Sequence, residues 1–155
     1  MIFLFIATIV FVADFIIKDY IDRNKKENTP ELILKDKVIV QKVYNKGMMF
    51  NLGEEKMELV TGLTVIIFLT SLAGFIYLLF KKGHGALKLG TSLVIGGAAS
   101  NLYDRLMKQK VVDYFSFNTK VKKIRQIVFN LSDWFIFIGV VIIFISKLKK
   151  IKESK

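Results

Sequence analysis

The sequence predicts an all-α membrane protein with four transmembrane helices and a small β-element on the outer face. Of its 155 residues, 53% are hydrophobic and the mean hydropathy is +0.45, which is too apolar for a soluble domain of this size. Four apolar segments approach or reach the roughly 20 residues that a membrane-spanning helix needs. No separate soluble module is evident between them, so we expect residues 1–155 to form a single integral membrane domain.

The four segments differ in length and polarity. The first, Ile2 to Ile17, is short, but it lacks the basic start and the small-residue cleavage site of a secretion signal, so we expect a retained helix. The second, Leu59 to Phe80, is the clearest. The third runs from about Leu87 to Leu106, and the fourth from about Ile127 to Ile145. In the third, the small residues of Gly96-Gly97-Ala98-Ala99 indicate close helix packing.

Lysines predict the orientation in the membrane. The connection Lys81–Lys88 has three lysines and no acid, and the tail from Lys147 has five lysines against Glu153. By the positive-inside rule both belong in the cytoplasm. Both termini are then cytoplasmic, and residues 19–58 and 107–126 lie outside. The second outer loop is itself basic, which departs from the rule.

The first outer loop predicts the β-element. Val38–Tyr44 is rich in β-branched and aromatic residues, which is typical of a strand. The following Asn45-Lys46-Gly47 has the composition of a turn. We therefore expect a small sheet on the outer membrane face.

The net charge of +11 indicates lysines that bind anionic lipid headgroups. Nucleic acid is not an expected partner, because no basic stripe interleaves with aromatic residues in a soluble segment. The chain has no cysteine, and His84 is its single histidine, so we expect neither thiol chemistry nor a zinc site.

Few acidic residues stand in or beside the apolar segments. Between residues 59 and 152 they are Asp104, Asp113 and Asp133, and the first segment adds Asp14. An ionisable group near hydrocarbon is costly, so it usually pairs with a partner or serves a function.

With the expected orientation, these acids meet other polar residues near the outer interface. Asn101, Asp104 and Arg105 are spaced i, i+3 and i+4, which predicts one helical face. Asn130 and Asp133, again i and i+3, begin the fourth segment. Each acid taken singly has a purely structural explanation. Asp14 can pair with Lys18, and Asp104 can sit beside Arg105 as an anchor at a helix end. Asp133 can interact with a helix dipole, and Asp113 can be a solvated loop acid. Anchoring does not easily explain their convergence.

Two classes of function fit such a cluster. Two close carboxylates share a proton, which is the apparatus of an aspartic protease, and Asp113 and Asp133 flank one outer loop. The alternative is a non-enzymatic protein, such as a small proton- or ion-coupled carrier that uses the same carboxylates. Carriers usually place ionisable groups near the midplane and show repeated halves, whereas this sequence shows no repeat and an outer cluster.

Five blocks of the sequence resemble the pattern of the lipoprotein signal peptidase (signal peptidase II) family. They are Asp14–Lys18, Asn45–Phe50, Gly96–Arg105, Val111–Tyr114 and Phe129–Asp133, and the third and fifth are the most specific. The resemblance covers nearly the whole chain. It agrees with four transmembrane helices and an outer β-element.

The resemblance implies an intramembrane aspartic endopeptidase of the bacterial cytoplasmic membrane. Its substrates would be diacylglyceryl-modified prolipoproteins, which enter laterally from the membrane lipid and are cut just before the lipidated cysteine. It implies a monomer with neither cofactor nor metal. The implied catalytic residues are Asp113 and Asp133; Asn45, Asn101, Arg105 and Asn130 would line or orient the substrate site, and Asp14, Lys18, Gly47 and Asp104 would support its geometry.

The chain departs from the family pattern at four positions. Met49, Ser100, Tyr114 and Ser132 stand where the family usually has Ala, Gly, Phe and Ala. Because every implied acid, amide and guanidinium is kept, we expect an effect on substrate preference rather than on the chemistry. Met49 in particular is expected to narrow the pocket.

Overall fold

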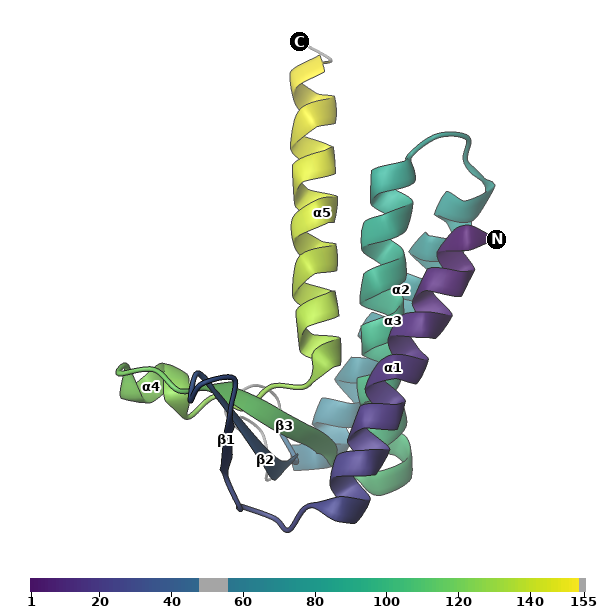
Figure 1. Cartoon of the computed structure of the whole chain (residues 1–155). Helices are drawn as coiled ribbons and strands as arrows, with labels where there is room; N and C mark the ends of the chain where they lie inside the picture. Colours follow the sequence, from purple (N-terminus) through teal and green to yellow (C-terminus); the bar gives the residue numbers. More distant parts are fainter. Residues whose placement is uncertain (48–55, 154–155) are drawn as a thin grey trace.

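The computed structural model describes residues 1–47 and 56–153. Within them, long helices run along one another and a three-stranded sheet lies at one end, away from both chain termini (Figure 1). The elements are α1 (Ile2–Asn24), β1 (Glu31–Ile33), β2 (Val38–Asn45), α2 (Met57–Phe80), α3 (Gly85–Lys108), β3 (Val111–Phe117), α4 (Lys122–Arg125) and α5 (Leu131–Glu153).

The first helix is longer than the sequence predicts. It continues to Asn24 instead of ending near Ile17, because its apolar face continues onto the sheet. There Ile21 forms a buried cluster with Val112 and Tyr114 of β3. Asp14 consequently lies in the middle of a helix rather than near its outer end.

The last helix begins later than predicted, at Leu131 instead of Ile127. The residues before it follow the sheet, since Phe129 forms an antiparallel bridge with Phe115. The two backbones exchange hydrogen bonds, 2.7 Å from Phe129 N to Phe115 O and 3.0 Å from Phe115 N to Phe129 O. This pairing ends the extended segment where the helix starts.

Helix α3 is central and packs against α1, α2 and α5. Glycines bring it close to two of these neighbours, which confirms the packing predicted from its small residues. A Cβ at Gly96 would lie 2.5 Å from Ala7 O of α1. Where α3 crosses α5, a Cβ at Gly139 would lie 2.5 Å from Gly90 O. Small residues let helix backbones approach in this way.

Gly139→Ala is therefore expected to lower the thermal unfolding midpoint of the purified protein. The added methyl overpacks the crossing, which typically costs about 1–3 kcal/mol. Gly74→Ala on α2 is the matched control, since a Cβ there meets nothing within 4 Å, and it gains the helix propensity of alanine, up to about 1 kcal/mol. Equal midpoints for the two variants would contradict the close α3–α5 crossing.

The sheet has the order β1-β2-β3 with antiparallel pairing throughout. Strand β2 confirms the predicted strand, whereas β1 and β3 were not anticipated. In the β2–β3 register, Val43 lies opposite Asp113 and Asn45 opposite Val111. Because strand residues alternate between faces, Asn45 and Asp113 lie on the same face of the sheet, as diagonal neighbours.

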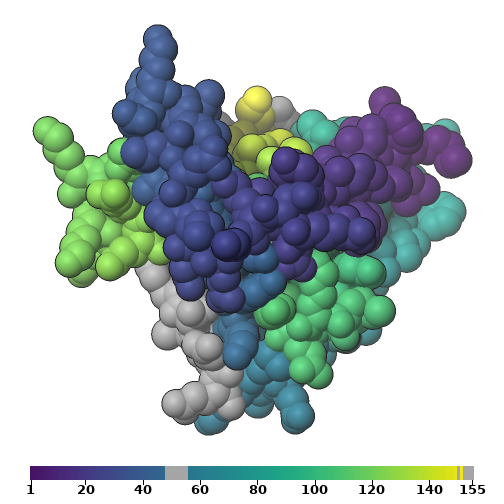
Figure 2. Space-filling model, turned by 60° about the horizontal axis from the view of Figure 1, so that its bottom comes forward, coloured from purple at the N-terminus to yellow at the C-terminus, as the bar shows by residue number. Residues whose placement is uncertain are grey.

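Seen from the sheet end, the molecule presents the sheet-side end of α1, the strands and, at one margin, α4 (Figure 2). Every residue of α4 is exposed, and three of its four residues are basic. This basic helix lies in the second predicted outer loop.

Two helices within the described ranges are long and apolar enough to cross a membrane, Met57–Phe80 and Leu131–Lys149. Both expose large apolar side chains, such as Ile66 and Phe144, as lipid-facing helices do. The mostly helical fold with its small sheet is compatible with a membrane protein.

Candidate active site

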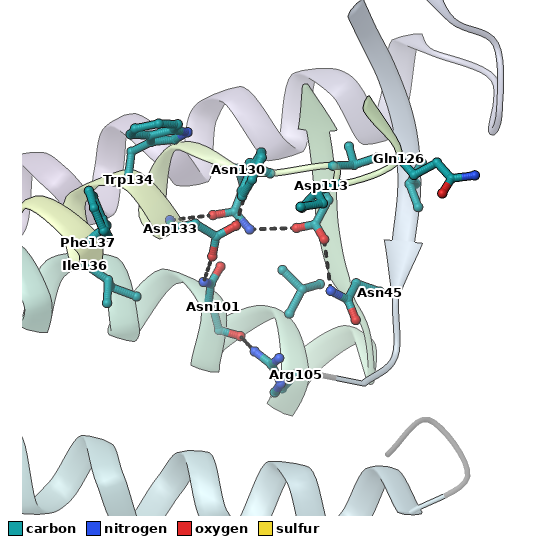
Figure 3. A pocket seen from close by; sticks show the side chains of 15 residues that line it. Asn45, Asn101, Arg105, Asp113, Gln126, Asn130, Asp133, Trp134, Ile136 and Phe137 are labelled. Atoms are coloured by element: carbon teal, nitrogen blue, oxygen red, sulfur yellow. Dashed lines mark hydrogen bonds between the residues drawn. The ribbon is translucent and has the colours of Figure 1, made fainter. Parts of the chain in front are cut away.

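A cavity of about 500 Å³ lies between α3, α5 and the β2–β3 pair (Figure 3). One side is polar and the other is apolar. The polar lining residues are Asn45, Asn101, Arg105, Asp113, Gln126, Asn130 and Asp133, and the apolar wall includes Phe129, Trp134, Ile136 and Phe137.

The start of α5 fixes Asp133 through a reciprocal capping arrangement. Asn130 Oδ1 accepts a hydrogen bond of 3.0 Å from Asp133 N, and Asp133 Oδ2 accepts one of 3.1 Å from Asn130 N. Such a capping box satisfies two helix-end N–H groups at once. The i, i+3 spacing seen in the sequence thus places an amide and a carboxylate together at the helix N-terminus.

Asp113 of β3 is held from two sides by amides. Its Oδ1 accepts a hydrogen bond of 2.8 Å from Asn130 Nδ2, and its Oδ2 accepts one of 3.0 Å from Asn45 Nδ2. The oxygens of both amides have donors of their own: Asp133 N for Asn130, and Gly47 N, at 3.0 Å, for Asn45. Each amide therefore turns its NH₂ group toward Asp113.

Asn101 of α3 orients Asp133 in the same manner. Its Nδ2 donates a hydrogen bond of 3.0 Å to Asp133 Oδ1, while its Oδ1 accepts one of 2.7 Å from Lys18 Nζ. Consequently all four carboxylate oxygens of Asp113 and Asp133 accept a hydrogen bond from a donor with fixed orientation. Such preorganisation is typical of catalytic groups.

Arg105 connects α3 to the end of β2. Its Nη2 donates a hydrogen bond of 3.0 Å to Gly47 O. This contact holds the turn that carries Asn45. Met49, which the sequence predicts to narrow the pocket, lies outside the described residues.

Asp14, Lys18 and Asp104 lie behind the cavity rather than in its wall. Lys18 Nζ is 2.9 Å from Asp14 Oδ2 and 3.3 Å from Asp104 Oδ2, and all three side chains are at most 1% exposed. The predicted Asp14–Lys18 pair is confirmed, and it is buried inside the protein.

The three α3 residues predicted to share one face do not all line the cavity, although Asn101 and Asp104 both contact Lys18 Nζ. Asn101 and Arg105 line the cavity, whereas Asp104 turns toward Lys18 and Lys108 rather than pairing with Arg105. Its Oδ2 also accepts a hydrogen bond of 3.2 Å from Val112 N. The reason is that α1 and β3 supply donors on that side of α3.

Burial, followed by the nearby charge of Asp133, raises the pKa of Asp113 to about 7. The amides of Asn45 and Asn130 act in the opposite direction, because they stabilise the charged carboxylate. Near neutral pH one proton is therefore available to the pair, which suits combined acid and base chemistry.

The sequence prediction missed Gln126 and the aromatic wall. Trp134 and Phe137 lie four and seven residues after Asn130, at helical spacing, so the sequence could have indicated that they share a face with Asn130. Trp134 packs edge-on against Phe117 and Phe137. No sequence signal marked Gln126, which lies in the segment between α4 and α5.

The fold is that of a bacterial membrane enzyme. A solved structure described in those words aligns with a TM-score of 0.84 at 24% identity, covering 99% of this chain and 91% of that one. The model of the signal peptidase (SPase) II family matches residues 6–149.

Curated relatives agree with the family match. The chain is 32% identical to the lipoprotein signal peptidase of Moorella thermoacetica over 141 residues, which cover 91% of this chain and 89% of that protein. It is 34% identical to the lipoprotein signal peptidase of Caldicellulosiruptor bescii over 110 residues, 70% of this chain and 65% of that protein. The chain belongs to the signal peptidase II family and is accordingly a peptidase.

Proposed function

We propose that the protein removes signal peptides from diacylglyceryl-modified prolipoproteins, cutting before the lipidated cysteine, with Asp113 and Asp133 as the catalytic pair. One observation carries this proposal. The four oxygens of the two carboxylates accept hydrogen bonds from Asn45 of β2, Asn101 of α3 and Asn130, the residue before α5, at a cavity that also has an apolar wall.

In the proposed reaction, the ionised member of the pair takes a proton from a water molecule that attacks the scissile carbonyl carbon. The protonated member donates its proton to the carbonyl oxygen, and later proton transfer to the leaving nitrogen completes the cleavage. The raised pKa of Asp113 suits it to the role of the acid. Asp133, at the N-terminus of α5, is favoured as the base, because the helix dipole stabilises a negative charge there.

The remaining polar residues have proposed roles around this pair. Asn45, Asn101 and Asn130 orient the carboxylates, and Arg105 holds the backbone of Gly47. Trp134 and Phe137 supply an apolar surface suited to the acyl chains of the substrate.

The direct test uses a synthetic prolipoprotein peptide with S-diacylglyceryl cysteine and the purified protein. The expected products, identified by mass spectrometry, are the free signal peptide and a fragment that begins with the lipidated cysteine. Cleavage at another bond would refute the proposed specificity. Absence of cleavage together with ion flux in liposomes would favour the carrier function.

The reaction is expected to slow above about pH 7. Above the pKa of Asp113 the second carboxylate ionises and the acid is lost, whereas below it the pair keeps its proton. Asn45→Ala removes a donor that stabilises the charged form, so it should move this decline to higher pH, by about one pH unit for roughly 1.4 kcal/mol. The measurement is kcat against pH. A decline at unchanged or lower pH in the variant would contradict the assignment.

We further propose that the chain is a single membrane domain, active as a monomer, in which α1, α2, α3 and α5 all span the bilayer. Each is 23 or 24 residues long, about 35 Å at 1.5 Å per residue, which suffices for the hydrocarbon core. The lysine-bearing α2–α3 connection lies at the opposite end from the sheet (Figure 1). This arrangement supports cytoplasmic termini and an active site near the outer face.

Cysteine labelling tests this orientation directly, because the chain has no cysteine of its own. In intact cells, a membrane-impermeant maleimide should label Lys120→Cys beside α4. It should label Lys82→Cys in the α2–α3 connection only after permeabilisation. Labelling of Lys82→Cys in intact cells would overturn the proposed topology.

A further inference from the structure

The carboxylate of Asp14, which lies outside the cavity, has an unusual number of donors. It is fully buried. Oδ2 accepts hydrogen bonds from Ser132 Oγ at 2.5 Å and Ser100 Oγ at 2.6 Å, and pairs with Lys18 at 2.9 Å. Oδ1 accepts hydrogen bonds from Tyr114 OH at 3.0 Å and Leu131 N at 3.1 Å.

Three of these donors are hydroxyl groups from three different elements, which we call the hydroxyl cluster: Ser100 of α3, Tyr114 of β3 and Ser132 of α5. The two serines are at most 1% exposed and Tyr114 is 7% exposed. They are three of the four positions at which the sequence departs from the family pattern. Far apart in the sequence, they meet on one carboxylate of α1.

Each member of the hydroxyl cluster is the chain neighbour of a residue in the cavity wall. Ser100 precedes Asn101, Tyr114 follows Asp113, and Ser132 precedes Asp133. On β3, neighbouring side chains point to opposite faces, so Tyr114 reaches Asp14 while Asp113 faces the cavity. On each element, one residue contacts Asp14 and the adjacent residue lines the cavity.

Asp14 also reaches the pair through two further contacts. First, Asp14 Oδ1 accepts a hydrogen bond from Leu131 N, the first backbone N–H of α5, and Leu131 lies between Asn130 and Asp133 in the chain. Second, Asp14 pairs with Lys18, whose ammonium donates a hydrogen bond to Asn101 Oδ1. This leaves the NH₂ group of Asn101 directed toward Asp133.

We propose that the hydroxyl cluster is a positioning device that sets the relative placement of Asp113, Asp133 and Asn101 by tying their three elements to Asp14. The inference rests on the proposed catalytic pair. The three hydroxyl residues touch no substrate in this proposal and act through the carboxylate. Their loss should lower kcat and leave KM nearly unchanged, because the cavity wall itself is not altered.

The test uses variants that delete only the hydroxyl groups: Ser100→Ala, Tyr114→Phe, Ser132→Ala and the triple combination. With the diacylglyceryl peptide, the triple variant is expected to lose on the order of tenfold to a hundredfold in kcat, since misplacement by about 1 Å costs up to that much. KM should stay within about twofold. Ser92→Ala is the matched control on α3, because this buried hydroxyl donates its hydrogen bond to Leu89 O of its own helix rather than to Asp14. Its kcat should equal that of the wild type.

A double-mutant cycle separates positioning from general packing. If the hydroxyl groups act through Asp14, deleting them in an Asp14→Asn background should cost much less kcat than in the wild type. Equal losses in both backgrounds would refute action through Asp14, and wild-type kcat in the triple variant would refute the proposal altogether. If the triple variant does not fold, as judged by its unfolding midpoint, the same kcat comparison is made with the single variant Ser132→Ala in both backgrounds.

These results are distinguishable from failure of the proposed function. A wild-type protein that does not cleave the lipidated peptide refutes that function. A wild-type protein that cleaves, with hydroxyl-deletion variants that cleave equally fast, refutes only the positioning role.

Discussion

Asp113→Asn and Asp133→Asn are each expected to reduce kcat by about a hundredfold to ten-thousandfold, the usual contribution of acid–base catalysis. Asparagine keeps the volume of the side chain but can neither take a proton from water nor hold the shared proton. The two variants should still fold and insert, since the volume is unchanged. Their unfolding midpoints should be somewhat lower, because each new NH₂ group faces a donor that the carboxylate oxygen accepted from.

The measurement is single-turnover cleavage of the diacylglyceryl peptide, with thermal unfolding recorded for each variant. Asp19→Asn is the matched control, because this carboxylate is partly exposed and pairs with Arg23 away from the cavity; it should retain the wild-type rate. Near-normal cleavage by either active-site variant would exclude the proposed pair.

A peptide whose cysteine carries no lipid is expected to be cleaved at least about a hundredfold less efficiently. Each buried methylene of an acyl chain contributes about 0.8 kcal/mol to membrane binding. Four methylenes in contact with the apolar wall at Trp134 and Phe137 would therefore raise kcat/KM by roughly a hundredfold.

The control substrate for this comparison carries an S-glyceryl group without acyl chains, which separates the thioether from the lipid. It should be cleaved as slowly as the unmodified peptide. Equal kcat/KM values for the lipidated and unmodified peptides would refute lipoprotein specificity and leave the assignment of the two carboxylates intact.

Much of the helical framework was predictable, because hydropathy is a local property of the chain. The segment Leu59–Phe80 agrees with α2 within two residues at its start and coincides with it at its end. Glycines on α3 indicated the close helix contacts that the structure contains. The i, i+3 spacing of Asn130 and Asp133 indicated a shared helical start, which the capping arrangement confirms.

Element boundaries were less predictable where tertiary contacts act on them. Packing on β3 extends α1 to Asn24, and pairing of Phe129 with Phe115 delays α5 to Leu131. Strand β3, which carries Asp113, was not predicted, although Val111–Phe117 is rich in β-branched and aromatic residues. Whether such a short segment forms a strand depends on the partner strand that it pairs with.

The sequence by itself determined the class of the protein, the apolar segments and the polar residues that gather in one region, since composition, period and spacing are local. Only the tertiary structure decided that Asp104 turns away from the cavity, that three amides present their NH₂ groups to two carboxylates, and that three distant hydroxyl groups meet on Asp14. Each of these depends on side chains from different elements, whose separation and direction are set by helix crossings and strand register rather than by order along the chain.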